Sequence, residues 1–287
     1  MTALFAASCC FGVMAVLVRL AARELDALEV AWVRFAGSFV LLVALSRGRG
    51  LRPRAGNLGP LVLRGLLGAS AIVCYFAGIA RAGAGLATLL HSIYPVFTAL
   101  WGVVLLGQGL TGRVVAALAL SAFGASIVLH DQLGQGPAVL TGVGLSLLGG
   151  VLAGGAVLTA GELRRTESAS LVTVWFMVVG AVVTAPALVD GMPWPTPALA
   201  AALGGVVIAS ATGQWLLHHG LGFVSPTLGS LAVATSVVTA SVLEALVMGQ
   251  TVRGGVVAGG VLMLAAVGLA TTARRVPPPV AEHAGGR

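Results

Sequence analysis

Long apolar segments recur along the whole chain, separated by short stretches that carry charge, glycine or proline. Each segment comes close to the roughly 20 residues that an α-helix needs to cross the hydrocarbon core of a bilayer. The pattern therefore predicts an all-α integral membrane protein with ten transmembrane helices. They are expected over residues 3–22, 27–46, 60–80, 86–106, 112–130, 138–160, 170–190, 197–217, 224–248 and 253–272.

Composition agrees with this pattern. Of the 287 residues, 58% are hydrophobic and 9% are charged, and the mean hydropathy is +1.03, whereas a soluble domain carries about 25% charged residues. The first apolar segment lacks the basic start and cleavage site of a secretory signal, so we expect it to be retained as a helix. The polar, proline-rich residues 274–287 are predicted to be a disordered cytoplasmic tail.

The positive net charge of +7 would suggest nucleic acid as the partner of a soluble protein, but here it bears on orientation in the lipid bilayer. All 16 basic residues are arginines. If both termini are cytoplasmic, four arginines face outward, Arg34 lies within a span, and eleven face the cytoplasm, which is the arrangement that the positive-inside rule favours. These eleven are Arg47, Arg49, Arg52, Arg54, Arg64, Arg113, Arg164, Arg165, Arg274, Arg275 and Arg287.

The chain repeats its plan at an offset of 142 residues, which is close to half its length. The offset aligns Gly78 with Gly220, Thr88 with Ser230, Leu89 with Leu231, Gly107 with Gly249, and Gln108 with Gln250. We therefore predict two five-helix repeats, residues 1–133 and 134–273. Because five is odd, the second repeat enters the membrane from the opposite side, and such inverted repeats enclose a site near the midplane.

Three segments carry a family resemblance: "WVRFAGSFVLL", "YFAGIARAGAGLATLLHSIYPVFTALWGVVLLGQGLTGRVVAALALSAFGASIV" and "LVMGQTVRGGVVAGGVLMLAAVGLA". They resemble the EamA-type, ten-helix branch of the drug/metabolite transporter superfamily. The resemblance implies a secondary transporter in a bacterial plasma (inner) membrane that exports a small metabolite, amino-acid-like or drug-like solute. The chain departs from the family where Gln108 and Gln250 replace Glu. Val237 also stands where the first repeat has Pro95, so only the first repeat keeps the proline that frees a carbonyl four residues earlier, and we expect the two halves not to move identically.

Several kinds of chemistry are absent from the sequence. Without lysine, the chain has no Walker A loop and no residue for a retinal or pyridoxal-phosphate linkage. His218 and His219 are adjacent and so point to different helix faces, and Cys9, Cys10 and Cys74 fit no zinc or redox spacing. We therefore predict no cofactor, no metal and no catalytic residue, and no nucleic acid partner.

The candidate substrate-binding residues are polar or aromatic groups at membrane depth, where burial is costly and function is the default hypothesis. They are Arg34, His91, Tyr94, Gln214 and Trp215. Arg34 either contacts substrate or an internal partner, or snorkels to water. His91 and Tyr94 either line a ligand site beside Pro95 or serve as a backbone contact and an interfacial anchor. Gln214 and Trp215 form either a hydrogen-bonding and stacking wall or interhelical glue.

Glu244 is the candidate coupling residue, since a membrane carboxylate suits proton coupling, although access to water would make it an ordinary carboxylate. The leading hypothesis is alternating access around a midplane cavity bounded by the second, fourth, seventh, eighth and ninth predicted helices. The alternatives are an intramembrane enzyme, for which no recognised arrangement exists in the sequence, and a non-transporting assembly partner or receptor.

Overall fold

The computed structural model describes residues 2–47, 52–54, 56–107, 112–132, 134–189, 191–224, 226–249 and 253–272. Within these ranges the chain is helical and contains no strand. The predicted tail at residues 274–287 lies outside the described residues. The elements are α1 Thr2–Ala21, α2 Ala27–Ser46, α3 Leu58–Ala82, α4 Ala84–His91, α5 Tyr94–Leu106, α6 Gly112–Gln132, α7 Pro137–Leu163, α8 Ala169–Thr184, the 3₁₀ turn η1 Ala185–Leu188, α9 Pro197–Gly220, α10 Pro226–Ala234, α11 Ser236–Met248 and α12 Gly254–Thr272.

Seven of the described helical segments are long and apolar enough to cross a membrane, with α4 and α5 together counting as one of them. Three shorter apolar segments lie at Val115–Asp131, Ala232–Met248 and Gly254–Ala266. The chain is therefore an integral membrane protein built from helices, as the hydrophobic pattern predicted.

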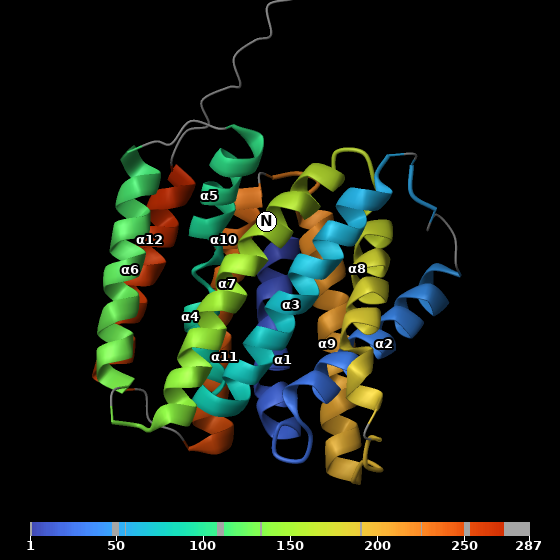
Figure 1. Cartoon of the computed structure of the whole chain (residues 1–287), viewed down its shortest axis with the longest axis horizontal. Coiled ribbons are helices and arrows are strands. Elements are labelled where there is room, and N and C mark those ends of the chain that lie inside the picture. The colour runs from blue at the N-terminus through green and yellow to red at the C-terminus, as the bar shows by residue number, and fades with distance from the viewer. Residues whose placement is uncertain are drawn as a thin grey trace, which may run out of the picture.

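The helices form a single bundle with a pair at one side and a broader group at the other (Figure 1). The pair consists of α6 and α12, which pack along each other. At the opposite side α2 packs on α8 and α9, while α3 packs on α7 and α1 packs on α9 through the middle. Helices distant in the sequence thus share the interior of the bundle.

Two of the predicted helices are broken in the middle. The predicted span 86–106 divides at Ser92 and Ile93 into α4 and α5, and the span 224–248 divides at Thr235 into α10 and α11. Pro95 lies in the first turn of α5, where its missing N–H leaves no intrahelical bond unmade. It therefore begins a helix rather than bending one.

The second break, between α10 and α11, occurs without a proline. Thr235 donates from its hydroxyl to the Ala232 carbonyl at 2.7 Å. The Ser8 and Thr235 hydroxyl oxygens lie 2.8 Å apart, so Ser8 is the donor to Thr235. Side-chain bonds that compete with the backbone ladder are a recognised cause of helix distortion.

Glycine allows α7 to lie very close to the break between α4 and α5. A Cβ added at Gly154 would lie 2.7 Å from the Phe97 Cβ, and one at Gly150 would lie 2.9 Å from the His91 carbonyl oxygen. Contacts this short are not tolerated. The small residues of α7 are thus a helix-packing face, and this face places α7 beside the broken helix.

Candidate functional site

A small cavity lies in the interior of the bundle, between the two broken helices. It is lined by residues of α1, α3, α4, α5, α7, α8, α9, α10 and α11. Its volume is about 80 Å³, which accommodates a few water molecules but is below the roughly 300–1,000 Å³ of sites for drug-sized ligands. The cavity is therefore too small for a drug-sized ligand. The polar and aromatic residues around it include Arg64, Tyr75, His91, Tyr94, Phe176 and Gln214.

One wall of the cavity is an aromatic group at the α4–α5 break. The His91 ring stacks on Tyr75 with centroids 4.4 Å apart, and the Tyr94 ring lies 5.8 Å from His91. His91 ends α4 and Tyr94 begins α5, so the two do not share one continuous helix face as predicted. The structure nevertheless places both beside the cavity, and within the described chain His91 Nδ1 has no hydrogen-bond partner.

The Tyr75 hydroxyl is part of the same wall. Its oxygen lies 2.6 Å from Thr88 Oγ1, and Thr88 donates its own proton to the Ala84 carbonyl at 2.6 Å. Tyr75 is therefore the donor to Thr88. The pair fixes the tyrosine ring against which His91 stacks, and it ties α3 to α4.

Gln214 and Trp215 do not act as one wall. Gln214 is buried and lines the central cavity, and its Oε1 has no partner among the described residues. Trp215 is 37% exposed on another face of α9, where it stacks on His219 and donates to Ser170 Oγ at 3.2 Å. Neighbouring residues on a helix are about 100° apart, so adjacency in sequence separates their side chains.

Two arginines are buried beside the cavity. Arg34 has no exposed surface, and its guanidinium lies 4.6 Å from the Phe35 ring centroid and 5.5 Å from that of Phe176. Arg64 is 3% exposed, and its guanidinium lies 4.0 Å from the Phe176 centroid. Of the two, Arg64 lines the cavity. Snorkelling, the alternative considered for Arg34, does not occur.

Arg64, which was counted among the arginines facing the cytoplasm, is buried in the bundle. Arg64 lies within α3, and its side chain runs over Gly68, where an added Cβ would lie close to the Arg64 guanidinium. The side chain therefore points along α3 into the bundle rather than back to the nearest helix end. Gly68 could have indicated this direction from the sequence. It lies one turn after Arg64, and a side chain at that position would occupy the space that the Arg64 side chain fills.

His218 contacts the Arg64 guanidinium. In the sequence, His218 was considered only as a metal ligand, and no metal site was predicted there. Arg64 Nη2 lies 3.3 Å from His218 Nε2, and His218 Nδ1 lies 2.7 Å from Thr173 Oγ1. Arginine can only donate, so Nε2 is the acceptor and Nδ1 carries the proton. Thr173 in turn donates to the Ala169 carbonyl at 2.7 Å. The chain of bonds runs in one direction from Arg64 to the backbone of α8.

Glu244 lies outside the central cavity, near one end of the bundle. It is 6% exposed, and its two carboxylate oxygens accept the backbone N–H groups of Ala84 at 2.6 Å and Gly85 at 2.5 Å. It thus caps the N-terminus of α4 from α11, an arrangement that a helix N-terminus favours. It also lines a separate polar cavity of about 540 Å³ with Arg19 and Arg81.

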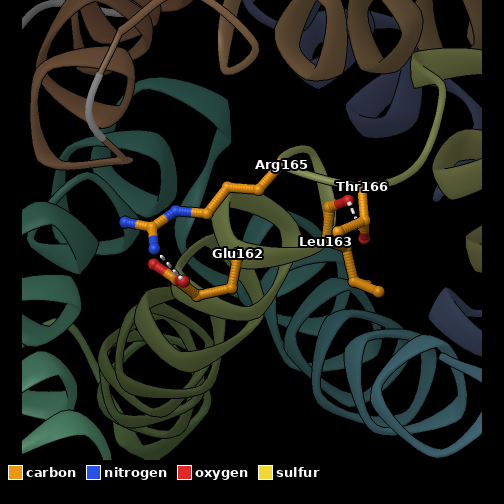
Figure 2. Close-up of polar contacts among 4 residues, drawn as sticks. All are labelled: Glu162, Leu163, Arg165 and Thr166. Carbon is orange, nitrogen blue, oxygen red and sulfur yellow. Dashed lines mark hydrogen bonds and ion pairs between the residues drawn. The ribbon is translucent and has the colours of Figure 1, made fainter. Parts of the chain in front are cut away.

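The loop between α7 and α8 contacts the loop that precedes α3. Figure 2 shows the exposed ion pair between Arg165 Nη1 and Glu162 Oε2 at 3.1 Å, next to Leu163 and Thr166. Beyond it, the Glu167 carboxylate accepts the backbone N–H of Arg54 at 2.8 Å and the side-chain amide of Asn57 at 2.7 Å. The carboxylate therefore ties the α7–α8 loop to the start of α3.

Arg164 reinforces the same end of the bundle. Its Nε donates to the His218 carbonyl at 2.7 Å, and Nη1 donates to the Glu167 carbonyl. Burial lowers the pKa of this guanidinium from its ordinary value, but arginine remains charged at neutral pH. Within the described ranges, no group of three or more His, Cys, Asp or Glu residues could hold a metal ion.

Two comparisons find that parts of this chain are similar to transporters. Residues 1–130 match the EamA-like transporter family. The pseudopaline exporter CntI of two Pseudomonas aeruginosa strains is 29% identical over 180 residues, which is 63% of this chain and 63% of the exporter. The match thus spans less than two thirds of the curated relatives.

A protein of known crystal structure superposes with a TM-score of 0.67 at 18% identity, over 93% of this chain and 95% of that one. At this identity the likeness concerns the fold alone. It extends over both halves of the bundle, whereas the family match covers the first. The match of residues 1–130 to the EamA-like transporter family agrees with the resemblance in the sequence.

Proposed function

We propose that this chain is a secondary transporter that exports a small solute by alternating access around the central cavity. The observation that carries the proposal is the cavity itself, which lies where the two broken helices meet and is lined from both halves of the chain. Broken helices at the junction of two repeats are how many secondary transporters build a midplane site. The name of the related exporter supports the outward direction.

The proposed architecture is ten spans in two inverted repeats, residues 1–133 and 134–273. Features recur at the offset of 142 residues that relates the repeats. The N-caps Asp26 of α2 and Ser168 of α8 are separated by this offset, and so are Ile93 and Thr235 at the two breaks. Gly107 and Gly249 follow α5 and α11 with left-handed φ values of 62° and 65°.

The packing of the helices supports the same relation. If α1, α2, α3, α4, α5 and α6 correspond to α7, α8, α9, α10, α11 and α12, the main helix contacts have exchanged counterparts. Thus α3 packs on α7 as α9 packs on α1, and α5 packs on α7 as α11 packs on α1. Likewise α4 contacts α11 and α10 contacts α5, while α2 with α8 and α6 with α12 are self-paired. This pattern is expected of a pseudo-two-fold axis through the cavity.

Contacts at the two ends of the bundle support a way for access to alternate. At one end of the bundle Glu244 joins α11 to the start of α4, and at the other Glu167 joins the α7–α8 loop to Asn57. Export requires these ends to open in turn while the cavity expands around the solute. Under the proposed topology both termini are cytoplasmic in a bacterial plasma membrane. Protons remain the candidate coupling ion, with Glu244 as the candidate coupling residue.

The test is an untargeted comparison of solutes in the medium of bacteria with and without the chain, followed by uptake of the identified solute into inside-out vesicles. Replacing His91 by Ala, Tyr94 by Phe or Gln214 by Ala removes a group beside the cavity. Each loss should weaken apparent affinity several-fold, since one hydrogen bond contributes about 1 kcal/mol. Trp215→Phe is the matched control, because Trp215 lies on an exposed face away from the cavity.

An assembly partner or receptor would show no protein-dependent solute in the medium. An intramembrane enzyme would change the amount of a compound without moving it across sealed vesicles. If the three cavity variants transport like the wild type at equal amounts of protein, the cavity is not the transport site, and these residues serve only in packing between helices.

A further inference from the structure

The two buried arginines beside the cavity lack the partners that such groups require. All three nitrogen atoms of the Arg34 guanidinium, and Nε and Nη1 of Arg64, are buried without a hydrogen-bond partner in the part of the chain that the structure describes. Neither residue forms an ion pair there. Burying a guanidinium without a compensating anion is strongly unfavourable, so such groups in a membrane protein indicate function.

The pair lies deep in the bundle. Both guanidinium groups lie within 5.5 Å of the centroid of the Phe176 ring. They belong to α2 and α3, which begin at opposite ends of the bundle (Figure 1). Phe176 lies at the middle of α8. The positive charge is therefore concentrated at mid-depth, away from the water at either end.

Other arginines of the described chain show how this protein ordinarily satisfies a guanidinium. Arg19 donates to the carbonyl oxygens of Ile79 and Ala80 at the end of α3, and Arg253 pairs with Asp131 at 3.2 Å. Arg64, by contrast, donates through Nη2 to a neutral imidazole, and its two other nitrogen atoms remain for a further acceptor. The arrangement orients the guanidinium and leaves its donors open.

We propose that the solute binds in the central cavity through a carboxylate, which Arg64 receives while Arg34 adds positive potential from behind Phe176. This assignment rests on the proposed transport function and specifies its substrate class: small organic anions with an apolar portion. Guanidinium and carboxylate match in geometry as well as in charge. Arg34 does not line the cavity, so it is a positioning residue rather than a contact.

The remaining lining explains the apolar portion. Phe11, Tyr75, Tyr94 and Phe176 surround the cavity, and no Asp or Glu is among its described lining residues. Aromatic walls favour an apolar or aromatic body. The absence of a lining carboxylate gives an ammonium group no counter-charge, so the site discriminates in favour of anions.

Equilibrium binding to the purified full chain in nanodiscs tests the assignment without any transport. The probe is radiolabelled 3-phenylpropionate, with 3-phenylpropionamide and 3-phenylpropylamine as uncharged and cationic competitors. We expect the acid to bind and compete, and the amide and amine to compete at least tenfold more weakly, as loss of a charge-assisted contact implies a factor of roughly 10–100. Equal competition by all three compounds overturns the proposal.

Arg64→Met should abolish this binding, and Arg64→Lys, which keeps the charge but loses the parallel donors, should retain part of it. Arg34→Met should weaken binding less than Arg64→Met does. It should also raise the thermal unfolding midpoint of the ligand-free chain, because an uncompensated charge is removed. Arg165→Met, an exposed position, is the control for one lost positive charge.

Unchanged binding in Arg64→Met overturns the proposal, and a lower unfolding midpoint in Arg34→Met shows that Arg34 is structural. The experiments distinguish a failure of the proposed transport function from a failure of the proposed substrate class. Carboxylate-specific binding without any exported solute would refute transport alone, whereas export of solutes that lack an anionic group would refute the substrate class alone.

Discussion

Replacing Glu244 by Ala should destabilise the junction between the two halves. The carboxylate is the partner of two backbone N–H groups, those of Ala84 and Gly85 at the first turn of α4. Removing it leaves both donors unpaired, and each unpaired buried donor costs about 1–3 kcal/mol. Because the adjoining cavity of about 540 Å³ provides space for water, we expect the lower part of the resulting range, about 2–4 kcal/mol. Glu244→Gln keeps one acceptor and should lose about half as much.

The assay is thermal unfolding of the purified full chain in detergent, followed by tryptophan fluorescence. A loss of this size corresponds to a fall in midpoint on the order of 5–10 °C for a chain of this length. Glu162→Ala is the matched control, since Glu162 forms only an exposed ion pair with Arg165 (Figure 2), and such pairs contribute about 1 kcal/mol or less. If both variants shift the midpoint equally, Glu244 does not hold the α4 N-terminus.

Two further outcomes test the topology and the packing. In a cysteine-free background, a membrane-impermeant maleimide should label Arg81→Cys but not Arg52→Cys on intact cells; the reverse pattern would invert the proposed orientation. Gly154→Ala should lower the unfolding midpoint, because its Cβ would lie 2.7 Å from the Phe97 Cβ and overpacking costs about 1–3 kcal/mol. Gly144→Ala on the same helix meets nothing within 4 Å and should leave the midpoint unchanged or higher; similar losses in both would show that α7 does not need glycine for this contact.

The hydrophobic pattern was sufficient for the fold class because a bilayer leaves few solutions. A backbone in hydrocarbon must satisfy its own hydrogen bonds, so a run of about 20 apolar residues implies a helix. The breaks at Ser92 and Thr235 were not readable in the same way. They depend on side-chain bonds and on the close approach of α7, which involve residues far apart in sequence.

The candidate site was predictable in part. Polar residues at membrane depth are few, so His91, Tyr94 and Gln214 stood out by their cost of burial, and the structure places all three beside the cavity. Arg64 did not stand out, because a residue near the start of a helix ordinarily reaches water. Its inward direction depends on the missing side chain at Gly68 and on His218, which belongs to α9.

The sequence by itself determined that this chain is a helical membrane protein and that its segments recur at a fixed offset. Both the length of an apolar segment and an internal repeat can be read from the order of residues alone. Only the tertiary structure decided which polar groups meet. It separated Gln214 from Trp215, which are neighbours in sequence, and brought Arg34 and Arg64 to the same phenylalanine ring. The physical reason is that helix rotation and packing set the direction of each side chain, and these depend on contacts between helices that no single segment encodes.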